Sequence, residues 1–194
     1  MTASCGSSPS LKMPPEKKSI PITEALPDRR RFGLMTVLVT IVILLDQFTK
    51  WQVSRAMRLH ESIAVIPDIF NMTYIRNSGA AFGILSGSQA GFRMVFFGVT
   101  SILALFLLGT IYARLSAGDR IGQASVALVF GGALGNLIDR VRIGEVIDFL
   151  DFSIFGYHWP AFNVADSAIT IGVGLLIGHF FLQKDEVPSQ TRAS

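Results

Sequence analysis

Several aspartates lie in or beside apolar segments, where a carboxylate costs free energy unless it has a partner or a function. Asp139, Asp148, Asp151 and Asp166 are close together in the sequence. Asp166 precedes an uncharged run, residues 167–183, so its charge must be met by tertiary neighbours or its proton retained. Two carboxylates that share one proton can activate a water and protonate a leaving group. Spacing alone does not choose between Asp148 and Asp151, nor does it exclude Asp139.

Other polar residues occur in pairs at helical spacing. The pairs are Asp46 and Lys50, Asn136 and Arg140, and Asn163 and Asp166. Residues three or four apart share one face of a helix, so each pair can point in one direction. Local ion pairing or snorkelling at a membrane boundary is the alternative for the first two pairs. We expect one polar site built from three helices.

The apolar composition indicates the elements that must position these pairs. Half of the 194 residues are hydrophobic and 16% are charged, and the apolar residues form long blocks. A helix that crosses a bilayer needs roughly 20 mainly apolar residues. Four segments qualify: residues 32–51, 94–113, 121–138 and 161–182. The expected fold class is an all-α polytopic membrane protein with four transmembrane helices.

An even number of spans places both termini on one side of the membrane. The arginines at positions 29–31 favour the cytoplasm for that side, because cytoplasmic flanks are rich in basic residues. The three polar pairs then all lie at the opposite, outer face. We expect a flexible cytoplasmic tail at 1–31, a membrane domain at 32–183 and a second cytoplasmic tail at 184–194.

The connection between the first two spans is too long for a tight turn. Residues 62–66 and 71–76 are strand-like and are separated by Pro67 and Asp68, which predicts a small β-element in this first extracytoplasmic loop. Glycines also recur at helical spacing in two spans, and small residues on one face permit close helix packing. They are Gly131 and Gly135 in the third span and Gly174 and Gly178 in the fourth.

Composition excludes some functions and leaves others open. The single cysteine rules out an intrachain disulfide, and a net charge of +3 without a continuous basic patch argues against nucleic acid as a partner. A magnesium-dependent lipid phosphotransferase could use the aspartates from Asp139 to Asp166. A transporter or proton channel could use Asp46, Lys50 and Asp166. A serine–lysine dyad of Ser88 with Lys50 is a weaker alternative.

Five short motifs together resemble lipoprotein signal peptidase, the signal peptidase II family. In order they are residues 46–50 (DQFTK), 77–83 (NSGAAFG), 135–140 (GNLIDR), 146–149 (VIDF) and 162–167 (FNVADS). They cover nearly all of the chain from about residue 33 to 183. The resemblance implies an aspartic endopeptidase with Asp148 and Asp166 as its dyad, and so favours Asp148 over Asp151.

The resemblance also implies the surroundings of the dyad and the substrate. Six polar residues would bind substrate or shape the site: Asp46, Lys50, Asn77, Asn136, Arg140 and Asn163. Asp139 would be structural, tied to Arg140 or to a neighbouring helix. No metal or other cofactor is implied. The expected substrate is a diacylglyceryl-modified prolipoprotein, cut just before the lipidated cysteine by a monomer in contact with lipid of the bacterial inner membrane, near its outer face.

Overall fold

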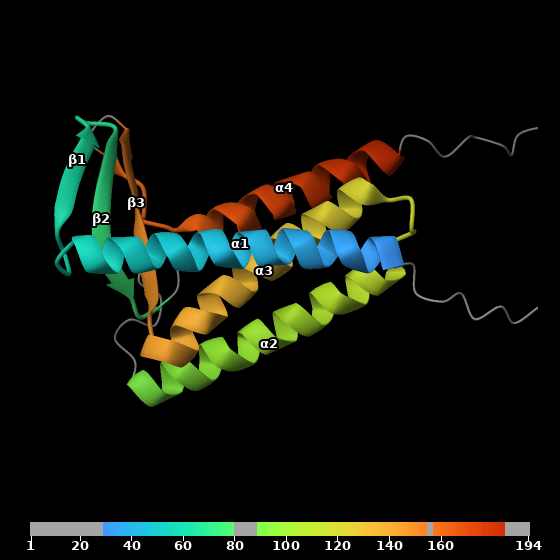
Figure 1. Cartoon of the computed structure of the whole chain (residues 1–194), viewed down its shortest axis with the longest axis horizontal. Helices are drawn as coiled ribbons and strands as arrows, with labels where there is room; N and C mark the ends of the chain where they lie inside the picture. The colour runs from blue at the N-terminus through green and yellow to red at the C-terminus, as the bar shows by residue number, and fades with distance from the viewer. Residues whose placement is uncertain (1–28, 80–88, 155–156, 185–194) are drawn as a thin grey trace, which may run out of the picture.

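Four helices dominate the structure, a computed structural model that describes residues 29–79, 89–154 and 157–184. They are α1 (Arg29–Ala56), α2 (Ala90–Arg114), α3 (Arg120–Ile143) and α4 (Val164–Lys184) (Figure 1). Each is long and apolar enough to cross a membrane, which confirms the four predicted spans. The helix α4 begins at Val164, three residues later than predicted.

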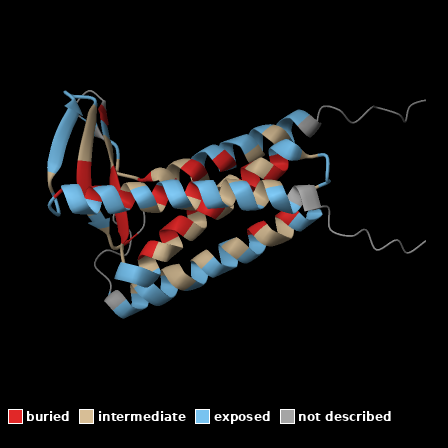
Figure 2. Ribbon diagram, viewed as in Figure 1, coloured by how far each residue is buried: buried red, intermediate tan, exposed pale blue. Residues whose placement is uncertain are grey.

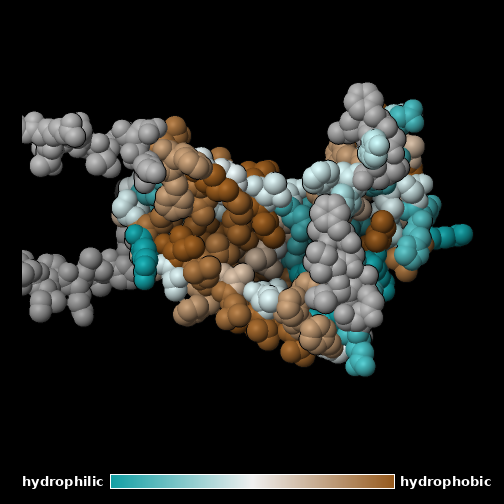
Figure 3. All heavy atoms as spheres, turned by 180° about the vertical axis from the view of Figure 1, so that it is seen from behind, coloured by the Kyte–Doolittle hydropathy of each residue, from teal (hydrophilic) through white to brown (hydrophobic). Residues whose placement is uncertain are grey.

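The helix α3 is central. It packs against α4, α1 and α2, whereas α1 has a smaller contact with α4. Buried residues gather on α3 and on the faces turned toward it (Figure 2). On the face seen in Figure 3 the helices are mostly hydrophobic, and hydrophilic atoms gather toward the end that carries the sheet. Large hydrophobic residues are exposed on all four helices. This distribution suits helices surrounded by lipid.

Glycines allow α3 to approach its neighbours closely. A Cβ atom added at Gly135 would lie 2.7 Å from Oδ2 of Asp46, and one at Gly132 would collide with the carbonyl oxygen of Ala165. Gly131 packs against Val42, as its predicted role requires. The prediction for the fourth span was wrong. A Cβ at Gly174 or Gly178 would meet no atom within 4 Å. The glycine of α4 that packs against Ser125 of α3 is instead Gly172.

An antiparallel sheet lies across one end of the helices (Figure 1). Its strands are β1 (Ser62–Ile66), β2 (Phe70–Asn77), β3 (Val146–Ile154) and β4 (Tyr157–His158), in that order. The first two form the predicted β-element. The strand β3 was not predicted, and it brings the α3–α4 connection beside β2, with Asp148 opposite Ile75. The sheet therefore unites two connections that are far apart in the sequence.

The inner face of the sheet packs on the end of α1. Phe149 and Ile147 of β3, with Tyr74 of β2, form a buried apolar cluster with Val53 and Met57. Just before β3, Gly144 ends α3 with a φ of 75°, a conformation that glycine adopts without strain. The chain can then turn at once into β3. These contacts fix the start of β3 against both α1 and α3.

Candidate active site

Asp148 and Asp166 line the same cavity, of about 730 Å³, at the sheet end of the helices. Asp148 lies on β3 and is 3% exposed, whereas Asp166 lies in the first turn of α4 and is half-buried. Three other predicted site residues line this cavity: Asn77, Asn136 and Arg140. Elements distant in the sequence therefore converge on one polar space.

Local capping fixes the start of α4 and the orientation of Asp166. The side-chain oxygen of Asn163 accepts a hydrogen bond from the backbone N–H of Asp166 at 2.9 Å. In return, Oδ2 of Asp166 accepts from the backbone N–H of Asn163 at 3.3 Å. This reciprocal pair satisfies two N–H groups that the helix itself leaves without partners. It also explains why α4 begins directly after Asn163.

Three asparagine amides hold the two carboxylates. Asn163 donates from Nδ2 to Oδ1 of Asp148 at 2.7 Å, and Asn77 donates to Oδ2 of the same carboxylate at 3.0 Å. Asn136 donates to Oδ1 of Asp166 at 2.7 Å. Asn163 thus bonds to both aspartates, and this shared partner keeps their carboxyl groups in a fixed relation.

The environment of Asp148 favours its protonated form. Burial, and after it the neighbouring charge of Asp166, raises the pKa of Asp148 to about 7. Hydrogen bonds from Asn77 and Asn163 and the charge of Lys50 act in the opposite direction. A carboxyl with this pKa holds its proton up to near-neutral pH, as a general acid requires.

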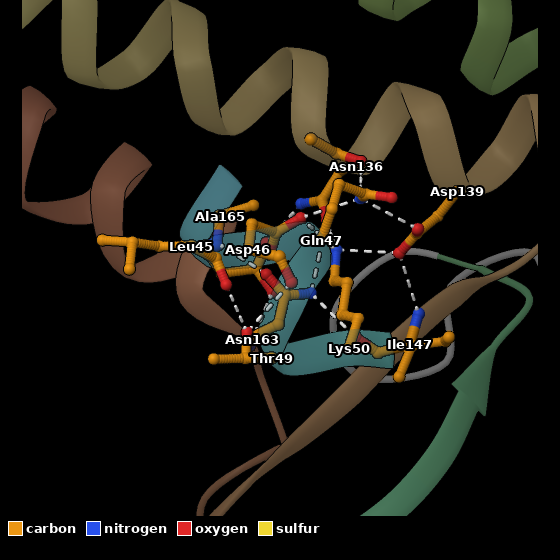
Figure 4. A network of polar contacts seen from close by, with 12 residues as sticks. Leu45, Asp46, Gln47, Thr49, Lys50, Asn136, Asp139, Ile147, Asn163 and Ala165 are labelled. Atoms are coloured by element: carbon orange, nitrogen blue, oxygen red, sulfur yellow. Dashed lines mark hydrogen bonds and ion pairs between the residues drawn. The ribbon is translucent and has the colours of Figure 1, made fainter. Parts of the chain in front are cut away.

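Asp46 and Lys50 belong to a network of polar contacts that includes Asn136 and Asp139 (Figure 4). The ammonium of Lys50 lies 2.9 Å from Oδ2 of Asp46 and 2.8 Å from Oδ2 of Asp139, and it donates to Oδ1 of Asn136 at 3.0 Å. Both Asp46 and Lys50 are almost fully buried and neither lines the cavity. They therefore support the residues that line the cavity and do not line it themselves.

Arg140 reaches the cavity from the end of α3. Its guanidinium lies 4.9 Å from the centre of the Phe97 ring of α2, a cation–π contact. Its charge interacts most strongly with Asp166 and then with Asp148. Asp139, in contrast, pairs with Lys50 of α1, which agrees with the predicted tie to a neighbouring helix.

The strand geometry separates Asp148 from Asp151. Successive side chains of a strand point to opposite faces, so two residues three apart lie on opposite sides of β3. Asp148 faces the cavity, whereas Oδ2 of Asp151 accepts a hydrogen bond from Thr73 at 3.3 Å. The sequence-level ambiguity between them disappears once residues 146–154 are known to be a strand.

Part of the cavity wall was not predicted from the sequence. Ile75 and Arg76 of β2 line the cavity, and so does Trp159, which is 64% exposed. Their positions could have indicated this role, because Ile75 and Arg76 directly precede the motif that begins at Asn77 and Trp159 lies shortly before the motif at 162–167. Four residues of the 77–83 motif, positions 80–83, lie outside the described residues, and so does Ser88. Among the described residues, no three His, Cys, Asp or Glu side chains form a group that could hold a metal ion.

Comparisons with known proteins identify relatives of this chain. Residues 38–182 match the family model described as "Signal peptidase (SPase) II". The chain is 48% identical over 147 residues to the lipoprotein signal peptidase of Syntrophotalea carbinolica, covering 76% of this chain and 90% of that protein. It is 50% identical over 144 residues to that of Syntrophus aciditrophicus, covering 74% and 89%.

A solved bacterial membrane enzyme has the same fold. Its structure superposes with a TM-score of 0.73 at 39% identity, covering 83% of this chain and 95% of that one. A second bacterial membrane enzyme gives a TM-score of 0.68 at 42% identity, covering 76% and 92%. On the family match and these relatives, the chain is a multi-pass bacterial membrane peptidase that belongs to the signal peptidase II family.

Proposed function

We propose that this protein is an aspartic endopeptidase that cleaves signal peptides from diacylglyceryl-modified prolipoproteins, just before the lipidated cysteine. The observation that carries the proposal is that Asp148 and Asp166 line one cavity and share Asn163 as a hydrogen-bond partner. The relatives' printed name, lipoprotein signal peptidase, supports the substrate class.

Two carboxylates held close together share one proton, and this sharing divides their roles. The ionised partner takes a proton from a water molecule, whose oxygen attacks the scissile carbonyl carbon. The protonated partner donates its proton to the carbonyl oxygen, forming a tetrahedral diol. Collapse of that intermediate breaks the C–N bond, and a proton passes to the leaving amine. The raised pKa of Asp148 supports retention of this shared proton near neutral pH.

The polar residues around the pair have separate roles in this mechanism. Asn77, Asn163 and Asn136 orient the two carboxylates, as their hydrogen bonds indicate. Arg140 lines the cavity and can bind a carbonyl oxygen of the substrate or stabilise negative charge that develops on it. Asp46 and Lys50 support the site from the interior.

The cavity also suits a substrate anchored in lipid. It is lined by polar residues near the sheet and by Ile169, Thr170 and Ile171 of α4, a helix with an apolar outer surface. A lipid-modified cysteine can remain at the membrane boundary while the adjacent peptide bond reaches the aspartates. Both carboxylates and their asparagine partners come from one chain, which supports a monomeric enzyme.

The proposed orientation places the sheet end at the outer, periplasmic face of the inner membrane. The peptidase domain then spans residues 32–183, with residues 1–31 and 184–194 as cytoplasmic tails. The even number of spans among the described residues and the arginines at positions 29–31 support this orientation. In this orientation the cavity meets precursors on the side to which they are exported.

The test is cleavage of one precursor in two forms. Purified protein in lipid nanodiscs is offered a prolipoprotein with, and without, the diacylglyceryl group on its cysteine. Mass spectrometry of the products should show that the lipidated form is cleaved just before its cysteine and that the unlipidated form is not cleaved. Equal cleavage of both forms would contradict the substrate class, and no cleavage of either by folded protein would contradict the proposed reaction.

A further inference from the structure

We propose that Asp139 is a positioning residue that aligns both aspartates of the dyad at once, through Lys50 on one side and through β3 on the other. This inference rests on the proposed function, since it assumes that Asp148 and Asp166 are the reacting pair. Asp139 itself does not line the cavity, and its residue is 1% exposed. It therefore acts through other residues and not on the substrate.

Asp139 uses both carboxylate oxygens in contacts to other elements (Figure 4). Its Oδ2 lies 2.8 Å from the ammonium of Lys50 and accepts a hydrogen bond from the backbone N–H of Ile147 at 3.3 Å. Its Oδ1 accepts from Nε2 of Gln47 at 3.1 Å. One side chain of α3 thus bonds to α1 and to β3.

The contact with Lys50 determines how Asn136 holds Asp166. An ammonium group can only donate hydrogen bonds, so the oxygen of the Asn136 amide must face it. The Nδ2 group of Asn136 then points away from Lys50 and donates to Oδ1 of Asp166 at 2.7 Å. If Lys50 moved, the Asn136 oxygen would lose the shorter of two contacts that fix its orientation, and only Nδ2 of Asn163, at 3.2 Å, would still donate to it.

The contact with Ile147 positions Asp148. Ile147 directly precedes Asp148 on β3, and its N–H is bound by Asp139 while its carbonyl oxygen accepts from Nδ2 of Asn163 at 3.2 Å. The residue before Asp148 is therefore held on both sides of its backbone. A shift of β3 relative to α3 would have to break the Asp139 contact first.

Charge balance indicates that Asp139 is present for geometry. Lys50 already has a buried partner in Asp46, whose other oxygen accepts from the backbone N–H of Ala165 at 3.0 Å. Asp139 adds a second buried carboxylate beside this one ammonium, and the charge of Arg140 acts more strongly on Asp166 and Asp148 than on Asp139. The added negative charge is therefore only partly offset, which costs free energy. The two carboxylates connect Lys50 to different elements. Asp46 connects it to α4 through the N–H of Ala165, and Asp139 connects it to β3 through the N–H of Ile147.

The test is Asp139→Asn, with Asp151→Asn as the matched control. The variant keeps the Lys50–Asp46 pair and so should fold, but it loses the charged contact with Lys50 and weakens the one with Ile147. We expect kcat to fall about 10- to 100-fold with little change in KM, since a small misplacement of reacting groups has that effect. Asp151→Asn should stay near wild-type activity, because Asp151 lies on the opposite face of β3.

The pH profile separates positioning from a general loss of stability. The positive charge of Lys50 lowers the pKa of Asp148. Without the negative charge of Asp139, less of the Lys50 charge is compensated, so the pKa of Asp148 should fall further. The alkaline limb of the pH–activity profile should therefore move to lower pH. Asp139→Glu keeps the charge but displaces the carboxylate. It should lower kcat and leave the pH limb in place, which gives a second test if the Asn variant fails to fold.

Wild-type kcat in either folded Asp139 variant would overturn the inference, and so would a lower kcat in Asp139→Asn with an unmoved pH limb. A loss in Asp151→Asn as large as in Asp139→Asn would do the same. Failure of the proposed function is a different result, because it would appear as activity in Asp148→Asn whatever the Asp139 variants do.

Discussion

The side-chain amide of Asn163, the residue that directly precedes α4, donates a hydrogen bond at 2.7 Å to Oδ1 of Asp148, near the start of β3. Asn163 also exchanges hydrogen bonds with Asp166. A residue that caps a helix therefore also sets the separation of two carboxylates. Helix formation and assembly of the site depend on the same side chain.

The raised pKa of Asp148 predicts a pH-dependent cost to stability. The carboxyl ionises near pH 3.8 when unfolded but near pH 7 in the folded protein. The cost is therefore absent below the unfolded pKa, grows as pH rises toward 7 and is complete above it. Asp148→Asn removes this cost, so its stability relative to wild type should increase across that window, by at most a few kcal/mol.

Thermal unfolding of both proteins in detergent between pH 4 and pH 8 measures this effect, with Asp151→Asn as the control on the same strand. The gain of Asp148→Asn over wild type should be larger at pH 8 than at pH 4. An equal difference at both ends would mean that the carboxyl of Asp148 is not perturbed by its burial.

Much of the site could be predicted because helical spacing decides direction. The pairs Asp46 with Lys50 and Asn163 with Asp166 were expected to meet Asn136 at one end of the helices, and the structure brings them together there. The four spans and the strands at 62–66 and 71–76 were confirmed as well. In each case a local pattern in the sequence determines the local structure.

The strand β3 could not be predicted, because residues 146–152 mix apolar residues with two aspartates and lack the regular alternation of a half-buried strand. Pairing with β2, a long-range contact, decides its structure. The same reason left Asp148 and Asp151 equivalent at the sequence level. The burial of Asp46 and Lys50 behind the cavity was also beyond spacing arguments, since it depends on the close approach of α3 at Gly135.

Gly132 should be intolerant of any side chain. A Cβ there would collide with the carbonyl oxygen of Ala165, next to Asp166, so Gly132→Ala must move the start of α4 away from α3. We expect a loss of about 1–3 kcal/mol in stability and at least a tenfold loss of cleavage. The matched control is Gly174→Ala, where a Cβ meets no atom within 4 Å. Equal behaviour of the two variants would contradict the tight α3–α4 contact.

The proposed orientation can be tested by labelling single cysteines in a Cys5→Ser background. Ser62→Cys lies on exposed β1, and Ser116→Cys lies between α2 and α3 at the opposite end of the helices. In intact spheroplasts, a membrane-impermeant maleimide should label the first and not the second. After lysis it should label both. The reverse pattern would place the cavity on the cytoplasmic side.

A strong chelator should leave cleavage by the wild-type protein unchanged, because two carboxylates and a water are sufficient for the proposed reaction. The measurement is the rate of cleavage after dialysis against chelator, compared with protein dialysed against buffer and with chelated protein to which Mg²⁺ is restored. Loss of activity that Mg²⁺ restores would favour the magnesium-dependent chemistry considered for Asp139, Asp148, Asp151 and Asp166.

The most direct test of the proposed dyad is cleavage of a lipidated precursor by Asp148→Asn, Asp166→Asn and the double variant, each shown to be folded. Asparagine keeps the shape of aspartate but cannot exchange a proton as a carboxyl group does, so each single variant should lose all measurable cleavage. Because the pair acts as a unit, the double variant should be no worse than either single variant. Wild-type cleavage by either folded single variant would contradict the dyad.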